Sequence, residues 1–352
     1  MDRVSLALSK LVVNQILPRV DRRLDASRRP FNDEHLLRPH IHSGRWTGTH
    51  YGIFLPELPA PHRYLNTMTL IGATGTELFD TDYPAAGGPR RTATLMSSTA
   101  AERHHHDRTY DSVDDCYFAT DGSELCWAND LCIRAEYPYF TVHGRYRDFK
   151  VDLELTATGE VSYFGKSPLY THFSLLTECT GAIDDATGFT PIRGLGAVEY
   201  ARYLNPLQVN SGSTTRKLPA DFFTYQIVNL DAGTQILLTD VQARGTALCR
   251  LMHVRTSGFG AQVYPDVRMD VLEYQDNPAL DDRGHAMRIP HRFRWTAKDP
   301  AGAELLTLTG TVDTAFRSGH GRGYVCGYSY TGAYRGNPIA GSAYMEWVDL
   351  RR

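Results

Sequence analysis

From residue 46 onward the sequence is a succession of short runs with a period of two, separated by turn signals. In residues 151–157 apolar side chains alternate with polar ones, and Gly159 then turns the chain. The runs 117–120 and 123–126 flank Asp121-Gly122, a strong signal for a two-residue hairpin loop. Because strands joined by hairpins form antiparallel sheets, this pattern predicts a largely antiparallel β protein.

Three more pairs of runs flank glycine-containing turns: 227–230 with 235–241, 293–297 with 304–309, and 324–330 with 342–349. Strands alternating with long helices are absent, which argues against a doubly wound α/β fold. A repeat of about 40–50 residues is also absent, which disfavours a propeller. The architectures that remain compatible with this pattern are β-sandwiches and closed β-barrels.

Residues 1–24 have helical periodicity, with apolar residues recurring every four positions and basic residues on the other side. Pro18 should kink or end this helix. Two interpretations stay open: the helix packs on the body of the protein, or it lies in an anionic membrane surface. The N-terminus lacks the pattern of an export signal, so we expect a cytoplasmic protein, with peripheral membrane contact as the alternative.

The composition is that of an ordinary globular protein, with 42% hydrophobic and 22% charged residues among 352. This excludes intrinsic disorder, collagen and a multi-span membrane protein. A net charge of −3 provides no basic field for nucleic acid. The six cysteines form no C-x-x-C pair, and we expect them to be reduced and mostly buried.

The most irregular stretch, residues 181–221, contains three prolines and a polar run and is a plausible connection between two β halves. We therefore expect a helix and linker over 1–42, a first β domain over 43–205 and a second over 206–352.

Common catalytic motifs are missing: the sequence has no P-loop, no G-x-G-x-x-G after a strand, no G-x-S-x-G and no H-E-x-x-H. His104-His105-His106 resembles a metal site, but neighbours on a strand face opposite sides and the flanks are polar. We predict a solvated loop there and no metal site.

Three places combine polar and aromatic residues. In 168–176, Tyr170, His172 and Ser174 share one strand face, which is either a polar cluster in a pocket or a surface face. Glu199 is a lone carboxylate among small apolar residues, so it is either functional or paired with an arginine. Asp221 begins an aromatic run and either acts as an acid or caps the strand.

Tyrosine is abundant, with 20 residues against 14 Phe and 4 Trp. Tyr324, Tyr328 and Tyr330 fall on one face of a predicted strand. Such a row either packs a barrel core or lines a large apolar pocket with hydroxyl groups.

The segments 44–48 (GRWTG), 194–201, 221–233 and 341–346 (GSAYME), in this order and spacing, resemble the carotenoid 1,2-hydratase and AttH-like proteins, in a bacterial branch of that superfamily. The superfamily includes lipocalin-like Diels–Alderases. The resemblance implies two tandem lipocalin-like β-barrels and a cofactor-free enzyme for a hydrophobic substrate. Hydratase-type relatives carry a Gly-x-x-Trp-x-Asp-His-Glu motif, and here 194–201 takes its place with Glu199 as the only acid.

We therefore expect an all-β fold of two tandem barrels with an N-terminal amphipathic helix. The predicted function is a cofactor-independent isomerase, cyclase (including a pericyclase) or hydratase for a terpenoid, steroid or polyketide-like substrate; the alternative is a non-catalytic carrier of hydrophobic ligands. No metal or nucleic acid is expected, and the oligomeric state stays open. Glu199 or Asp221 would donate or accept the proton, and Tyr225 and His172 would orient or relay it. The predicted substrate-binding residues are Trp46, Trp127, Tyr170, Tyr200, Phe223, Tyr324 and Tyr328.

Overall fold

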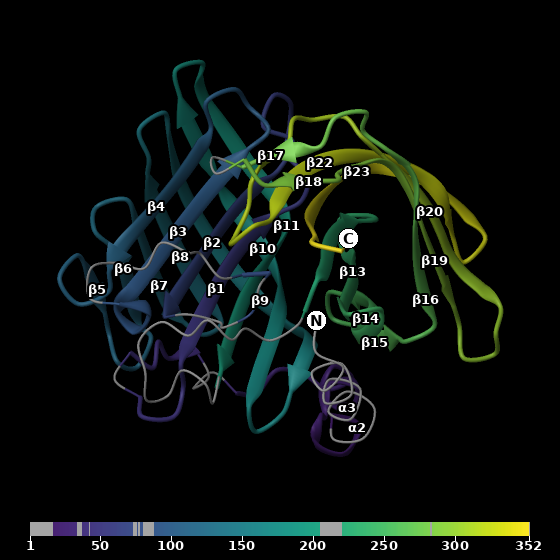
Figure 1. Ribbon diagram of the computed structural model, residues 1–352, viewed down its shortest axis with the longest axis horizontal. Helices are drawn as coiled ribbons and strands as arrows, with labels where there is room; N and C mark the ends of the chain where they lie inside the picture. Colours follow the sequence, from purple (N-terminus) through teal and green to yellow (C-terminus); the bar gives the residue numbers. More distant parts are fainter. Residues whose placement is uncertain are drawn as a thin grey trace.

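The computed structural model describes residues 17–33, 37–41, 43–72, 76, 78–79, 88–204, 220–281 and 284–351. These residues form two large curled antiparallel sheets, the first in purple to teal and the second in green to yellow (Figure 1). The prediction of an all-β chain with two barrel-like halves is confirmed. The predicted boundary at 205 and 206 lies in 205–219, outside the described residues.

The first sheet has the strand order β4-β3-β2-β1-β11-β10-β9-β8-β7-β6-β5. Pairing of β1 with β11 brings together the two ends of this half of the chain. The bounds are β1 Gly48–Leu55, β2 Leu65–Gly72, β3 Thr92–Thr99, β4 His105–Asp111, β5 Cys116–Phe118, β6 Glu124–Trp127, β7 Leu131–Glu136, β8 Tyr139–Arg145, β9 Phe149–Lys166, β10 Tyr170–Asp185 and β11 Gly188–Tyr203, with a 3-10 turn η3 at Pro89–Arg91.

The second sheet has the order β15-β14-β13-β12-β23-β22-β20-β19-β16, with β21 added beside β22 and a separate ribbon of β17 and β18. The bounds are β12 Phe222–Asn229, β13 Thr234–Ala243, β14 Thr246–Thr256, β15 Gly260–Tyr264, β16 Val267–Tyr274, β17 Ala279–Leu280, β18 Ala286–Met287, β19 Pro290–Lys298, β20 Glu304–Val312, β21 Arg317–Ser318, β22 Tyr324–Tyr334 and β23 Asn337–Asp349.

The hairpin predicted around Asp121-Gly122 is present, since Tyr117 of β5 pairs with Cys126 of β6. Its loop is longer than the two residues expected, because β5 ends at Phe118 and β6 begins at Glu124. Gly122 adopts a φ of +84°, which a residue with a Cβ rarely tolerates.

The described part of the N-terminal region holds two short helices, α2 Leu17–Val20 and α3 Arg23–Ala26. Residues 1–16 of the predicted helix lie outside the described residues. Arg23 donates hydrogen bonds to the carbonyls of Phe164, at 3.0 Å, and Leu248, at 2.9 Å. These two acceptors belong to different sheets, so Arg23 of α3 hydrogen-bonds to both sheets where they meet. No helix among the described residues has the length and apolar character needed to cross a bilayer.

The cysteine prediction was wrong for one pair. Cys126 and Cys132 form a disulfide between β6 and β7. They are direct partners in the antiparallel register, with Cα atoms 4.1 Å apart, a closeness that their six-residue spacing does not reveal. The other cysteines are free; Cys179, Cys249 and Cys326 are buried and Cys116 is half-buried.

Each sheet encloses an apolar core, and a third apolar cluster lies between the sheets. Strand alternation explains this division, because neighbouring side chains point to opposite faces. On β11, Val198 and Tyr200 belong to the first core, whereas Ala197 belongs to the cluster between the sheets. On β12, Phe222 and Val228 belong to the second core, whereas Tyr225 belongs to the cluster between the sheets. The outer faces of the two sheets therefore pack together and bury their polar residues.

Candidate active site

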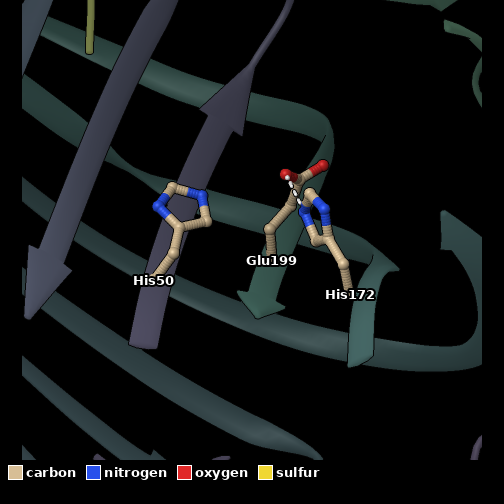
Figure 2. A group of neighbouring side chains, drawn as sticks. All are labelled: His50, His172 and Glu199. Atoms are coloured by element: carbon tan, nitrogen blue, oxygen red, sulfur yellow. Dashed lines mark hydrogen bonds and ion pairs between the residues drawn. The ribbon is translucent and has the colours of Figure 1, made fainter. Parts of the chain in front are cut away.

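His50, His172 and Glu199 meet on the outer face of the first sheet, where it meets the second. Their strands β1, β11 and β10 are adjacent, and both histidines lie opposite Ala201 in the register. Glu199 lies two residues before Ala201, so the period of two places it on the same face. Figure 2 shows the Glu199 carboxylate beside the His172 ring, with His50 on the neighbouring strand β1.

Glu199 accepts hydrogen bonds from both halves of the molecule. Nε2 of His172 lies 3.4 Å from Oε2 of Glu199, and the hydroxyl of Tyr225, on β12 of the second sheet, donates to Oε1. Glu199 is 2% exposed. A carboxylate this deeply buried is stable only when hydrogen bonds or charges replace the lost water.

The partners fix the direction of each hydrogen bond. Because a carboxylate only accepts, Nε2 of His172 carries a hydrogen, and Nδ1 of the ring lies 2.7 Å from the Tyr170 hydroxyl. Tyr170 is 38% exposed, so this chain of groups runs from the surface to the buried carboxylate. His50 donates Nδ1–H to the Thr69 carbonyl at 2.7 Å, which leaves its Nε2 as an acceptor.

The environment keeps Glu199 ionised. Burial alone would raise the pKa of Glu199, but the hydrogen bond and charge of His172, with the Tyr225 hydroxyl, hold it below its ordinary value. Burial, reinforced by the charge of His172, lowers the pKa of His50 to about 4, so His50 is neutral at pH 7. The site therefore presents an anionic base beside a neutral imidazole.

A second carboxyl group, Glu346 on β23, lies opposite Tyr225 in the register and is 8% exposed. Its Oε1 accepts from the Tyr344 hydroxyl at 3.3 Å. Burial raises the pKa of Glu346 well above its ordinary range, and the negative charge of Glu199 raises it further. Two carboxyl groups whose pKa values are driven apart form an acid and a base at one pH.

We predict that Glu346→Gln raises the melting temperature at pH 8 and leaves it nearly unchanged at pH 4. The folded-state pKa is raised, so the unfolded chain releases this proton above its ordinary pKa of 4.5 while the folded chain retains it. Stability contributed by the protonated carboxyl is therefore lost as pH rises, and a Gln side chain cannot ionise. Differential scanning calorimetry from pH 4 to pH 8 checks this, with the exposed Glu178→Gln as control. A melting temperature difference that does not change with pH would contradict it.

A buried arginine links the sheets beside this cluster. Arg255 on β14 is 0% exposed and donates Nη1–H to the carbonyl and hydroxyl of Ser174, at 2.8 and 3.1 Å. Its Nη2 donates to Oε1 of Gln235 on β13. Burial lowers the pKa of Arg255 to about 10, so it stays charged at pH 7 and offsets the charge of Glu199.

The other predicted catalytic acid, Asp221, lies away from this cluster. Its Oδ1 accepts from the Arg244 backbone N–H at 2.9 Å, and Oδ2 lies 3.6 Å from Nη1 of Arg244. It precedes Tyr225 by four residues, about 13 Å along an extended strand. In this structure its carboxylate caps the start of β12.

The predicted substrate-binding residues are placed in several regions. Trp127 and Tyr200 belong to the first core, and Tyr324 and Tyr328 to the second. Trp46 lies under the guanidinium groups of Arg45 and Arg202. The ring centroids of Phe223 and Phe79 are 5.0 Å apart. Of the predicted binding residues, Tyr170 is the one that hydrogen-bonds into the Glu199 cluster.

Sequence reasoning brought together Tyr170, His172, Glu199 and Tyr225 as candidates, and the structure joins all four. It missed His50, Arg255 and Glu346. The signal for Glu346 was available, because a lone acid among aromatic residues occurs in Ala343–Val348 as it does around Glu199. For His50 and Arg255 no local pattern distinguishes them from surface residues.

Besides the group that contains the Cys126–Cys132 disulfide, two groups of side chains among the described residues have the composition and spacing of metal ligands. In each, the potential ligand atoms lie within 4.8 Å of one another: His50, His172 and Glu199 form the first, and His62, His104 and Asp185 the second. The predicted solvated loop at His104-His105-His106 was wrong, because His104 is 4% exposed and the half-buried His105 and His106 begin strand β4. Nε2 of His104 lies 3.1 Å from Oδ2 of Asp185, a residue 81 positions later that the local sequence could not associate with it.

Comparisons with known proteins agree on the fold. A model described as a family of unknown function (DUF6670) matches residues 68–352. An AttH-like protein from Nitrosomonas europaea superposes with a TM-score of 0.59 at 14% identity, covering 87% of this chain and 93% of that one. Kievitone hydratase from Nectria haematococca gives 0.59 at 11% identity, covering 92% and 94%. CghA, solved with Sch210972, gives 0.53 at 10% identity, covering 87% and 89%.

The search of curated proteins found no match. At these identities the structural likeness shows the fold, and it confirms the predicted resemblance to the AttH-like double-lipocalin proteins, with two lipocalin-like barrels in tandem.

Proposed function

The chain belongs to DUF6670, a family of unknown function, and we propose that it is a cofactor-independent enzyme that transfers protons to and from a hydrophobic small molecule. The observation that carries this proposal is the Glu199 carboxylate, buried between the sheets and held by His172 and Tyr225. Glu199 acts as the general base. The Tyr170–His172 chain carries its proton to or from the surface.

Glu346 supplies the complementary acid. In a hydration, the Glu346 proton passes to an alkene carbon, and Glu199 takes a proton from the water that attacks the resulting cation. In an isomerisation, Glu199 removes a proton from one carbon and Glu346 donates a proton to another carbon. Both reactions use one protonated and one ionised carboxyl group at the same pH, which the two environments provide.

The surroundings favour an apolar substrate. Phe54, Met68, Met96, Phe164 and Tyr344 belong to the apolar cluster between the sheets. Aromatic faces can stabilise a carbocation and hold a flexible substrate in a reactive shape. A terpenoid, steroid or polyketide-like compound suits these apolar side chains, and two proteins of the same fold are named as a hydratase and as a complex with Sch210972.

One observation favours a second function, that of a ligand carrier. A cavity of about 410 Å³ opens between the ends of β14–β15 and β22–β23. Apolar residues such as Leu230, Val254 and Ile339 line it together with polar ones such as Asp231, Gln262 and Arg335, and Phe259, which also lines it, is 89% exposed. A carrier would use this cavity and would not need the proton chain at Glu199.

Incubation of the purified protein with lipid extracts of its host, in D2O and in H2¹⁸O, distinguishes these functions by mass spectrometry. A hydratase yields a product that contains ¹⁸O in H2¹⁸O, and an isomerase yields a product with the mass of the substrate in H2¹⁸O that is heavier in D2O by its carbon-bound deuterium. Cyclisation without deuterium uptake would show that substrate shape, and not proton transfer, drives the reaction. Recovery of bound ligands unchanged under all conditions would contradict the enzyme proposal and support the carrier.

A further inference from the structure

A second buried cluster lies at one end of the first barrel, where three connections converge. His62 lies in the segment between β1 and β2, His104 in the turn between β3 and β4, and Asp185 at the end of β10. Their side chains are 0%, 5% and 4% exposed. None of them belongs to the proposed proton-transfer site.

The ligand atoms converge on one point. Oδ2 of Asp185 lies 3.1 Å from Nε2 of His104 and 3.8 Å from Nε2 of His62. Two ligand atoms bonded to one tetrahedral Zn²⁺ are about 3.4 Å apart, given bonds of about 2.0–2.1 Å. The two measured separations lie on either side of that value.

The surrounding hydrogen bonds hold two of these ligands in place. Oδ1 of Asp185 accepts from the backbone and side chain of Thr187, at 2.7 and 2.6 Å, which leaves Oδ2 directed at the imidazoles. Nδ1 of His104 lies 3.0 Å from the Thr99 hydroxyl, which can accept its hydrogen and so place the ring's lone pair on Nε2. Such outer partners orient metal-bound histidines and carboxylates.

The cluster also contains a buried polar atom that no protein group satisfies. Nδ1 of His62 has no hydrogen-bond partner among the described residues, and Nε2 of His62 has the Thr190 hydroxyl at 3.2 Å. If Nε2 of His62 binds an ion, Nδ1 carries the hydrogen of the neutral ring and is not itself a ligand. A simple His104–Asp185 ion pair does not explain why a second imidazole is buried against it.

We propose that His62, His104 and Asp185 bind a structural Zn²⁺ ion that fastens the end of the first barrel. Two imidazoles and one carboxylate suit zinc and leave a fourth position for water. Two contacts next to the cluster reach the second half of the chain. Arg63, next to His62, pairs with Asp313 at 3.0 Å, and Arg317 donates to the carbonyl of Ala101 at 3.0 Å. The ion therefore also stiffens this part of the junction between the barrels.

Isothermal titration of the full-length, chelator-treated protein with Zn²⁺ tests the proposal. We expect one Zn²⁺ per chain, a melting temperature that rises with Zn²⁺, and no response to Mg²⁺. His104→Gln should abolish stoichiometric binding, and Thr99→Val should weaken it about 10- to 100-fold. His143→Gln, which removes an exposed histidine 2.6 Å from Asp152, is the matched control and should bind normally.

His172→Gln separates this site from the other potential ligand group. Retained binding in His172→Gln supports the proposal. Loss in His172→Gln with retention in His104→Gln would place the ion at Glu199 and overturn it, as would the absence of stoichiometric binding in the unmodified protein. If His104→Gln fails to fold, the X-ray absorption spectrum of zinc-loaded His172→Gln decides, because the rival group then retains a single imidazole: two imidazoles with oxygen ligands support the site, and any other donor set refutes it.

Discussion

Glu199→Gln is expected to lower turnover of the identified substrate by about 10²- to 10⁴-fold, the range typical of a lost general base. The amide has nearly the shape of the carboxylate and can still meet Tyr225 and His172, but it cannot accept the proton. Binding of the substrate should therefore change much less than kcat. Steady-state kinetics and equilibrium binding on the same preparation measure the two effects separately.

The control for this variant is Glu178→Gln, which makes the same chemical change at an exposed position of β10. Asp221→Asn then decides between the two predicted acids. Loss of turnover in Asp221→Asn together with normal turnover in Glu199→Gln would refute the role of Glu199. Normal turnover in both would leave a reaction driven by shape alone.

Arg255→Met is expected to lower the free energy of unfolding by about 3–5 kcal/mol, as for the loss of one partner from a buried charged network. Methionine fills similar space, but it leaves the Ser174 carbonyl and the Gln235 side chain without the guanidinium between the sheets. It also removes a cation that offsets the buried charge of Glu199. Urea denaturation followed by tryptophan fluorescence measures the loss.

Arg268→Met is the matched comparison, because Arg268 is a 73% exposed arginine of the second sheet that pairs with Asp270. Water and salt screen an exposed pair of this kind, so the effect of its loss should be small. Equal effects of the two substitutions would show that Arg255 does not connect the sheets energetically.

Much of the architecture could be predicted from local patterns. The alternation in residues 151–157 and the glycine turns report strands directly, because side chains on a strand alternate between faces. The same alternation placed Tyr170 and His172 on one face, and the Tyr170 hydroxyl indeed meets His172. Glu199 was recognisable because a lone acid among apolar residues requires a partner or a role.

Local patterns could not show which face of each strand turns inward. Alternation defines two faces, but only the packing of one sheet on the other shows that Glu199 and His172 lie outside the first barrel, where Glu199 is still buried and His172 is half-buried. The tyrosine row from 324 to 330 illustrates the same limit, since Tyr324, Tyr328 and Tyr330 belong to the core of the second sheet.

By itself, then, the sequence determined the strand class of the chain and its double-barrel resemblance, and it predicted four members of the proposed proton-transfer cluster. The tertiary structure decided the rest: β1 pairs with β11, which brings His50 to Glu199 across almost 150 residues of sequence, and the second sheet adds Glu346 and Arg255. The physical reason is that strand pairing and sheet packing are long-range contacts. Their energies come from groups that meet only after the chain has folded, so no window of sequence contains them.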